Sequence, residues 1–131
     1  MKLMISVDTN VLIRLLIADD TLQAEKARLL FEKETIYITK IVMLESEWVL
    51  RFAYGFATNV IASAFTKLLG QRNVTVEDDQ HIAESITLLN TGLDFADAIH
   101  LVCSENQLFA IFDKKLKNRA TEAGWTNVIL L

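Results

Sequence analysis

The stretch Leu3-Met4-Ile5-Ser6-Val7-Asp8-Thr9-Asn10 opens the chain with an apolar run that ends in a carboxylate. The arrangement returns far along the chain, where Leu108-Phe109-Ala110-Ile111-Phe112 runs into Asp113. A carboxylate at the end of a buried strand is unfavourable unless something compensates its charge. Open α/β folds bind ligands at the carboxyl edge of a parallel sheet. The two runs therefore predict one acidic pocket at that edge, with a divalent metal ion between its carboxylates.

Segments typical of strands and segments typical of helices alternate along the rest of the chain. Apolar or alternating runs predict strands at 3–7, 35–39, 73–76, 108–112 and 128–131. Apolar residues at helical spacing predict helices at 11–16, 21–31, 41–54, 58–69, 79–89, 94–105 and 114–123. Strands separated by helices predict an α/β protein whose parallel sheet is covered on both faces.

The composition fits one compact domain, which we expect over residues 1–131. The chain is 52% apolar, has no proline and only 4 glycines, and shows no stretch typical of a linker. Its single cysteine, Cys103, excludes an internal disulfide and fits a reducing compartment. Asp8 and Asn10 interrupt the apolar start too early for a signal peptide, and Arg14 follows them. No run approaches the ~20 residues of a membrane span. We therefore expect a soluble, cytoplasmic protein.

The charge balance argues against a generally basic nucleic-acid binder, because the formal net charge is −4. It does not exclude a nuclease, since metal ions and a local basic patch could hold phosphates. One dense basic cluster follows Asp113 directly and contains Lys114, Lys115, Lys117 and Arg119. Lys114 and Lys115 are therefore candidates for phosphate contact, although a solvated helix face explains them equally well.

Several acids have two interpretations. Asp8, Asp94 and Asp113 each precede a predicted helix, where aspartate caps free backbone N–H groups. Asp97 would then be an acid of the first helical turn, favoured by the helix dipole. Asp97 could also point into the pocket with Asp8 and Asp113. The two interpretations are compatible, because helix N-termini aimed at the pocket would offset part of the repulsion among its carboxylates.

The predicted helix 41–54 contains two glutamates that the apolar pattern separates. Glu45 shares a stripe with Ile41, Trp48, Val49 and Phe52, which should face the core. Glu47 lies on the other side and can form a solvated ion pair with Arg51 four residues on. Glu45 therefore needs a partner, either a metal ion or a structural salt bridge, for instance to Arg14.

Phosphodiester hydrolysis is the chemistry that such a set of acids suits. Mg²⁺ and Mn²⁺ prefer oxygen ligands and keep several of their waters. A bound ion lowers the pKa of a water and stabilises charge on the phosphate, and one carboxylate could hold or deprotonate the attacking water.

Four segments carry a resemblance to a known family. Val7-Asp8-Thr9-Asn10-Val11-Leu12 resembles the opening of PIN-domain ribonucleases, and Leu44-Glu45-Ser46-Glu47-Trp48-Val49-Leu50 resembles the second motif of VapC-type toxins. Phe95-Ala96-Asp97-Ala98-Ile99-His100 and Phe112-Asp113-Lys114-Lys115-Leu116 are similar to the third and fourth motifs. Order, spacing and total length fit, so the resemblance covers nearly the whole chain.

The resemblance implies a three-layer α/β/α sandwich with a central parallel sheet. It also implies a metal-dependent endoribonuclease that forms homodimers and acts as a toxin, neutralised by a small antitoxin that would occupy the acidic pocket. The family's acids fall on Asp8, Glu45, Asp97 and Asp113, the adjoining polar positions on Thr9 and Asn10, and a frequent arginine on Arg14. One departure is Ile111, which stands where the family usually has Thr or Ser.

Two other functions remain open. Ile111 removes a hydroxyl near the metal, which leaves a catalytically weak or inactive PIN-like module for RNA binding or dimerisation. A phosphoryl-transfer or receiver-like domain would use Asp8 as phospho-acceptor, but Asn10 occupies the place where a phosphatase of that type has a second aspartate.

His100 and Cys103 have a spacing that zinc can use, but the sequence shows no other His/Cys pair, and His81 stands alone on another helix.

Overall fold

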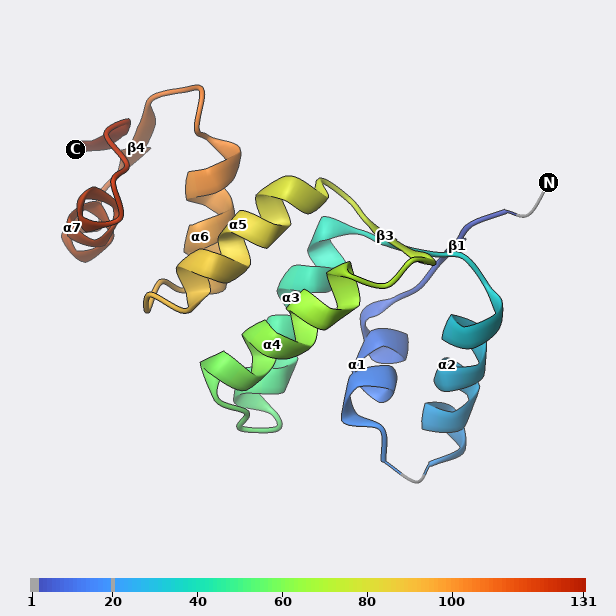
Figure 1. The fold of residues 1–131 in the computed structure, drawn as a ribbon. Helices are drawn as coiled ribbons and strands as arrows, with labels where there is room; N and C mark the ends of the chain where they lie inside the picture. The colour runs from blue at the N-terminus through green and yellow to red at the C-terminus, as the bar shows by residue number, and fades with distance from the viewer. Residues whose placement is uncertain (1–2, 20) are drawn as a thin grey trace.

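The computed structural model describes residues 3–19 and 21–131. Helices and strands alternate along this part of the chain (Figure 1). In order, the elements are β1 (Ile5–Ser6), α1 (Thr9–Ile17), α2 (Leu22–Lys33), β2 (Ile36–Ile38), α3 (Lys40–Phe52), α4 (Thr58–Leu69), β3 (Val74–Val76), α5 (Asp79–Leu89), α6 (Phe95–Cys103), β4 (Phe109–Ile111), α7 (Lys114–Glu122) and β5 (Val128–Leu130). Every helix and strand that the sequence predicts is present, with ends that shift by a few residues.

The strands pair in parallel, which confirms the predicted α/β class. β1, β2 and β3 form one sheet in that order, with Ile5 opposite Ile36 and Ile36 opposite Val74. β4 and β5 form a second sheet, with Ala110 opposite Ile129. The structure differs from the expected single central sheet in this respect, because no pairing within the described residues joins β1 to β4.

Two separate apolar cores accompany the two sheets. The larger core packs α1, α3, α4 and α5 around the first sheet, with Leu12, Ile38 and Phe65 at its centre. The smaller core joins the end of α5, α6, α7 and β5, and consists of Leu88, Leu93, Ala98, Leu101, Val102, Leu116, Ala120 and Val128. Figure 1 shows β4 and α7 at the opposite end of the molecule from β1, with α5 and α6 between them. We call the β4–α7–β5 segment the C-terminal body.

Helix α3 presents its two faces the opposite way from the prediction. Its buried residues are Val42, Met43, Ser46, Glu47 and Leu50. Ile41, Trp48 and Phe52 are 61%, 56% and 61% exposed, and Glu45 is exposed with them. Both faces of α3 carry large apolar residues, so the apolar pattern alone predicts the wrong buried face. Among the described residues, no helix is both long enough and apolar enough to cross a membrane.

Candidate active site

Asp8 lies at the end of β1 and caps α1. Its Oδ1 accepts a hydrogen bond from the Val11 backbone N–H at 3.0 Å, and its side chain is exposed. The next residue, Thr9, donates from Oγ1 to Oε1 of Glu45 on α3 at 2.8 Å. This bond fixes the orientation of the Glu45 carboxylate, so that Asp8 and Glu45 form the first part of the acidic site.

Asp113, Asp97 and Asp94 form the second part. Asp113 caps α7 by accepting from the Leu116 N–H at 3.1 Å, and Asp94 caps α6 by accepting from the N–H groups of Ala96 and Asp97. Burial raises the pKa of Asp97, and repulsion from Asp94 and then Asp113 raises it further, whereas His100 opposes the shift. The capping interpretation of Asp8, Asp94 and Asp113 is therefore confirmed, and Asp97 is a half-buried acid close to two other carboxylates.

A groove of about 450 Å³ runs between Glu45, in the first part of the acidic site, and the start of α6. Thr9 and Glu45 line one side, Asp94 and Ala96 line the other, and Trp48 contributes an exposed aromatic ring. Carboxylates from α3 and α6 therefore reach a common surface that is open to solvent.

The four predicted acids do not gather at one point within this chain. Asp8 follows a strand of the first sheet, whereas Asp113 follows a strand of the second sheet, at the other end of the molecule (Figure 1). In residues 3–19 and 21–131, the group of three possible metal ligands that does converge lies elsewhere, at Asp78, His81 and Cys103. The expectation of a single acidic pocket is therefore wrong for one chain taken alone.

Of the other predicted site residues, some are exposed to solvent and Arg14 is hydrogen-bonded to neighbouring side chains. Asn10 on the first turn of α1 and Lys114 and Lys115 at the start of α7 are exposed. Arg14 bonds Gln23 Oε1 at 3.1 Å and Asp19 Oδ2 at 3.4 Å. The suggested salt bridge from Arg14 to Glu45 is therefore wrong, since Glu45 has Thr9 as its partner.

The rest of the basic cluster supports the structure of the C-terminal body. Lys117 donates to the Val128 carbonyl and Arg119 to the Gly92 carbonyl, both at 2.6 Å. Among the four basic residues, this leaves Lys114 and Lys115, beside Asp113, as the candidates to meet a phosphate.

Arg51 is a supporting residue whose role the sequence shows only in part. It binds Glu47, as predicted, but Glu47 is 1% exposed rather than solvated. Arg51 also reaches Oδ1 of Asp94 at 3.2 Å, which joins α3 to the residue that caps α6. Since Asp97 lies on the first turn of α6, Arg51 helps to position the acidic site.

The family of the chain follows from a comparison that covers most of its length. The family model described as PIN domain matches residues 5–121, a segment that includes Asp8, Glu45, Asp97 and Asp113. The chain belongs to the PIN domain family. Members of this family are mostly metal-dependent nucleases. No curated protein and no solved structure that was compared matches the chain.

The carboxylates of this PIN domain suit a hard divalent cation. Burial raises the pKa of Asp97 and the neighbouring acids Asp94 and Asp113 raise it further, and a bound cation would offset both effects. Carboxylate oxygens are the ligands that Mg²⁺ and Mn²⁺ prefer. Ile111, two residues before Asp113, offers no hydroxyl to such an ion. A ligand set of all four acids would require Asp8 and Glu45 to reach the same ion as Asp97 and Asp113.

Proposed function

We propose that this PIN domain is a metal-dependent endoribonuclease that acts as the toxin of a toxin–antitoxin pair. The observation that carries the proposal is the match to the PIN family over 5–121, together with the placement of its acids at strand ends and helix starts. RNA is the substrate class, and the reaction is hydrolysis of a phosphodiester bond.

Each acid has a part in the proposed reaction. Asp97 and Asp113, with Asp8, would hold Mg²⁺ or Mn²⁺, and Glu45 would complete the acidic set. The bound ion supplies an activated water and stabilises charge on the phosphate. Glu45, whose carboxylate is oriented by Thr9, would accept a proton from the attacking water. Lys114 and Lys115 would contact phosphates on either side of the cleaved bond, with Asn10 and Arg14 nearer Asp8.

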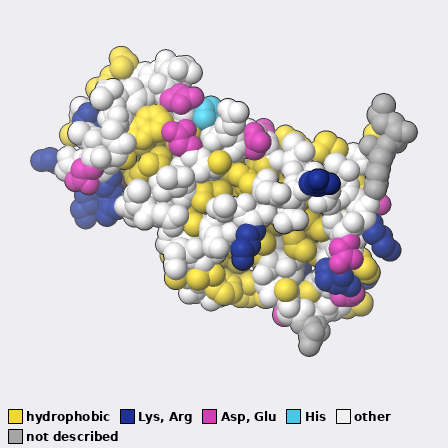
Figure 2. Space-filling model, in the orientation of Figure 1, with side chains coloured by type: hydrophobic (Ala, Val, Ile, Leu, Met, Phe, Trp, Pro, Cys, Tyr) yellow, Lys and Arg dark blue, Asp and Glu magenta, His cyan; other side chains and the backbone are white. Residues whose placement is uncertain are grey.

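The unpaired strand edges support a homodimer. Within the described residues, β1 pairs only with β2 and β4 only with β5, so each sheet has an edge with free backbone groups. Exposed apolar side chains accompany these edges, since Leu3 and Phe112 are 76% and 82% exposed. Figure 2 shows further apolar side chains open to solvent on the face in view. Parallel sheets are normally covered, and free edges attract another strand.

The smaller core argues that the missing strand comes from a second copy. Asn127 donates to the carbonyls of Ser104 and Gln107 at 2.9 Å, and Leu116 and Val128 pack against α6. Moving the C-terminal body to β1 of its own chain would break these contacts. If β4 of a second copy pairs in parallel with β1, Asp8 of one chain and Asp113 of the other meet at the same sheet edge.

The antitoxin would act on the same acids. A short segment with an arginine could pair with Asp97 and its neighbours, because guanidinium binds carboxylates through two parallel hydrogen bonds. Such a partner would compete with the metal ion. A purified complex should therefore cleave RNA more slowly than the free protein.

The decisive experiment is cleavage of total RNA by purified protein with Mg²⁺, with Mn²⁺ and with chelator. We expect discrete, metal-dependent fragments that disappear in Asp8→Asn. Glu84→Gln is the matched control, since Glu84 is an exposed acid on α5 outside the site. Equal cleavage by wild type and Asp8→Asn would contradict the proposal.

Ile111 supports one alternative, a PIN module that binds metal or RNA without turnover. This alternative predicts that folded wild-type protein binds Mn²⁺ yet leaves RNA intact. Ile111→Thr would then restore a hydroxyl two residues before Asp113, and cleavage gained by this variant would identify the missing group.

A further inference from the structure

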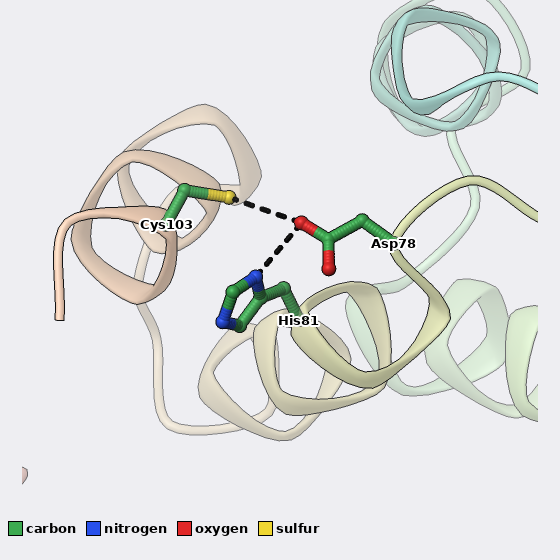
Figure 3. A group of neighbouring side chains, drawn as sticks. All are labelled: Asp78, His81 and Cys103. Atoms are coloured by element: carbon green, nitrogen blue, oxygen red, sulfur yellow. Dashed lines mark hydrogen bonds and ion pairs between the residues drawn. The ribbon is translucent and has the colours of Figure 1, made fainter. Parts of the chain in front are cut away.

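A second cluster of possible metal ligands lies away from Asp97 and Asp113, where the start of α5 meets the end of α6. Asp78 Oδ2, His81 Nδ1 and Cys103 Sγ lie within 4.8 Å of one another (Figure 3). His81 Nδ1 is 2.8 Å from Asp78 Oδ2, and Cys103 Sγ is 3.8 Å from the same oxygen. We propose that these three side chains form a Zn²⁺ site, independent of the proposed nuclease activity.

The spacing of the three atoms suits zinc. With bonds of about 2.0–2.3 Å, the ligand atoms of a tetrahedral zinc site are roughly 3.3–3.7 Å apart. The two contacts at 2.8 Å and 3.8 Å lie on either side of that range, so small side-chain rotations bring the atoms to bonding distance. Nitrogen, sulfur and oxygen donors together favour Zn²⁺, whereas Mg²⁺ takes oxygen alone.

The second nitrogen of His81 has the partner expected beside a metal ligand. Nε2 lies 2.8 Å from Oε1 of Glu105. A carboxylate at this position fixes the tautomer of a metal-bound histidine and orients its ring. A neutral imidazole has one N–H, yet both ring nitrogens of His81 face carboxylate oxygens. The ring can therefore satisfy both carboxylates only when it carries a second proton or a metal ion.

Asp78 is committed to the cluster rather than to its own helix. It precedes α5 with φ of 55°, and its side chain makes no capping bond to that helix. Its Oδ2 instead accepts from Lys40 at 2.9 Å and faces His81 and Cys103. Oδ2 of Asp78 is therefore the atom that Lys40, His81 and Cys103 all contact.

Lys40 supplies the competing cation. Its Nζ lies 2.9 Å from Asp78 Oδ2 and 3.5 Å from Cys103 Sγ, and its side chain is 30% exposed. The ammonium can therefore leave toward solvent when Zn²⁺ binds.

Zinc at this point would connect two parts of the fold. Asp78 follows β3 of the first sheet, and Cys103 is the last residue of α6, directly before the segment that leads to β4. The ion would thus hold the end of α6 against the first sheet and restrict how the C-terminal body moves.

The test is titration of metal-free, reduced protein with Co²⁺, followed by competition with Zn²⁺. We expect a thiolate-to-cobalt charge-transfer band and strong visible bands typical of four-coordinate cobalt, both lost when Zn²⁺ is added. Cys103→Ser should remove the charge-transfer band, and His81→Gln should weaken Zn²⁺ binding at least tenfold. His100→Ala is the matched control, because His100 stacks on Phe109 and is outside the cluster.

Lys40→Met distinguishes a metal site from a network of ion pairs. Removing the competing ammonium should tighten Zn²⁺ binding severalfold, a gain that misfolding cannot produce. Asp113→Asn should leave zinc binding unchanged, which separates this site from the proposed nuclease site. Absence of a thiolate–cobalt band in folded wild-type protein, or unchanged zinc affinity in both Cys103→Ser and His81→Gln, would overturn the proposal.

Discussion

Arg51 holds the buried carboxylate of Glu47 through hydrogen bonds of 2.7 Å from Nε and 3.1 Å from an Nη atom. The same guanidinium contacts Asp94, the residue that caps α6. A buried carboxylate is tolerated only when it is paired and hydrogen-bonded. The Arg51–Asp94 contact therefore connects α3 to the helix that carries Asp97.

Removing the guanidinium of Arg51 should destabilise the folded protein. We expect Arg51→Met to lower the free energy of unfolding by about 3 kcal/mol, since it leaves Glu47 charged and unpaired in the interior. Urea unfolding measures the change, and the double variant Glu47→Gln/Arg51→Met should regain most of it. Arg28→Met is the control. It loses exposed pairs with Glu25 and Glu32 and should leave the free energy of unfolding nearly unchanged.

Asp97→Asn should separate stability from activity. The pKa of Asp97 is raised above its ordinary 3.8, so the folded state is favoured below that pH and loses stability as pH rises through the higher folded value. The amide removes this loss, and we expect the melting temperature at pH 7 to rise by about 2 °C. Metal-dependent cleavage should be abolished. A variant that melts lower at pH 7 than wild type would contradict the raised pKa of Asp97.

Co-expression of two inactive variants tests whether two chains share the site. Asp8→Asn and Asp113→Asn should each be inactive alone. In mixed dimers, one of the two sites would combine the intact Asp8 of one chain with the intact Asp113 of the other, giving about a quarter of wild-type activity. If wild type cleaves RNA while the mixture stays inactive, each site is built within one chain. A wild type that does not cleave RNA would instead count against the nuclease function.

The pH dependence of stability should include His81. Its pKa is raised above 6.5 chiefly by the hydrogen bond to Glu105 and then by Asp78. The protonated ring therefore stabilises the fold fully below pH 6.5, and this contribution is lost as pH rises through the higher folded pKa. Thermal melts in chelator should show this loss in wild type and not in His81→Gln. Equal pH profiles would mean that the ring bears no net charge in the folded protein.

Local features could be predicted from the sequence because they depend on neighbouring residues. Helix α4 begins at Thr58 and ends at Leu69, as the apolar spacing predicts, and Gly70 follows it. The capping roles of Asp8, Asp94 and Asp113 also follow from position, since each precedes a helix and accepts from its first turn.

Features that depend on distant contacts could not be predicted in the same way. The apolar stripe predicts that Glu45 faces the core, whereas packing of α3 against α1, α4 and α6 buries the face with Glu47. Cys103 was paired in sequence with His100, but α5 brings His81 to it instead. The division of the strands into two sheets depends on how α6 packs, which no single segment encodes.

The division of the strands has a consequence for dosage. If β1 of one chain needs β4 of another, the number of working sites rises with the square of chain concentration at low abundance. If the chain is the toxin that we propose, a few molecules free of antitoxin would then be nearly harmless, and toxicity would appear above a threshold. Activity per chain that falls on dilution would be the biochemical sign of this threshold.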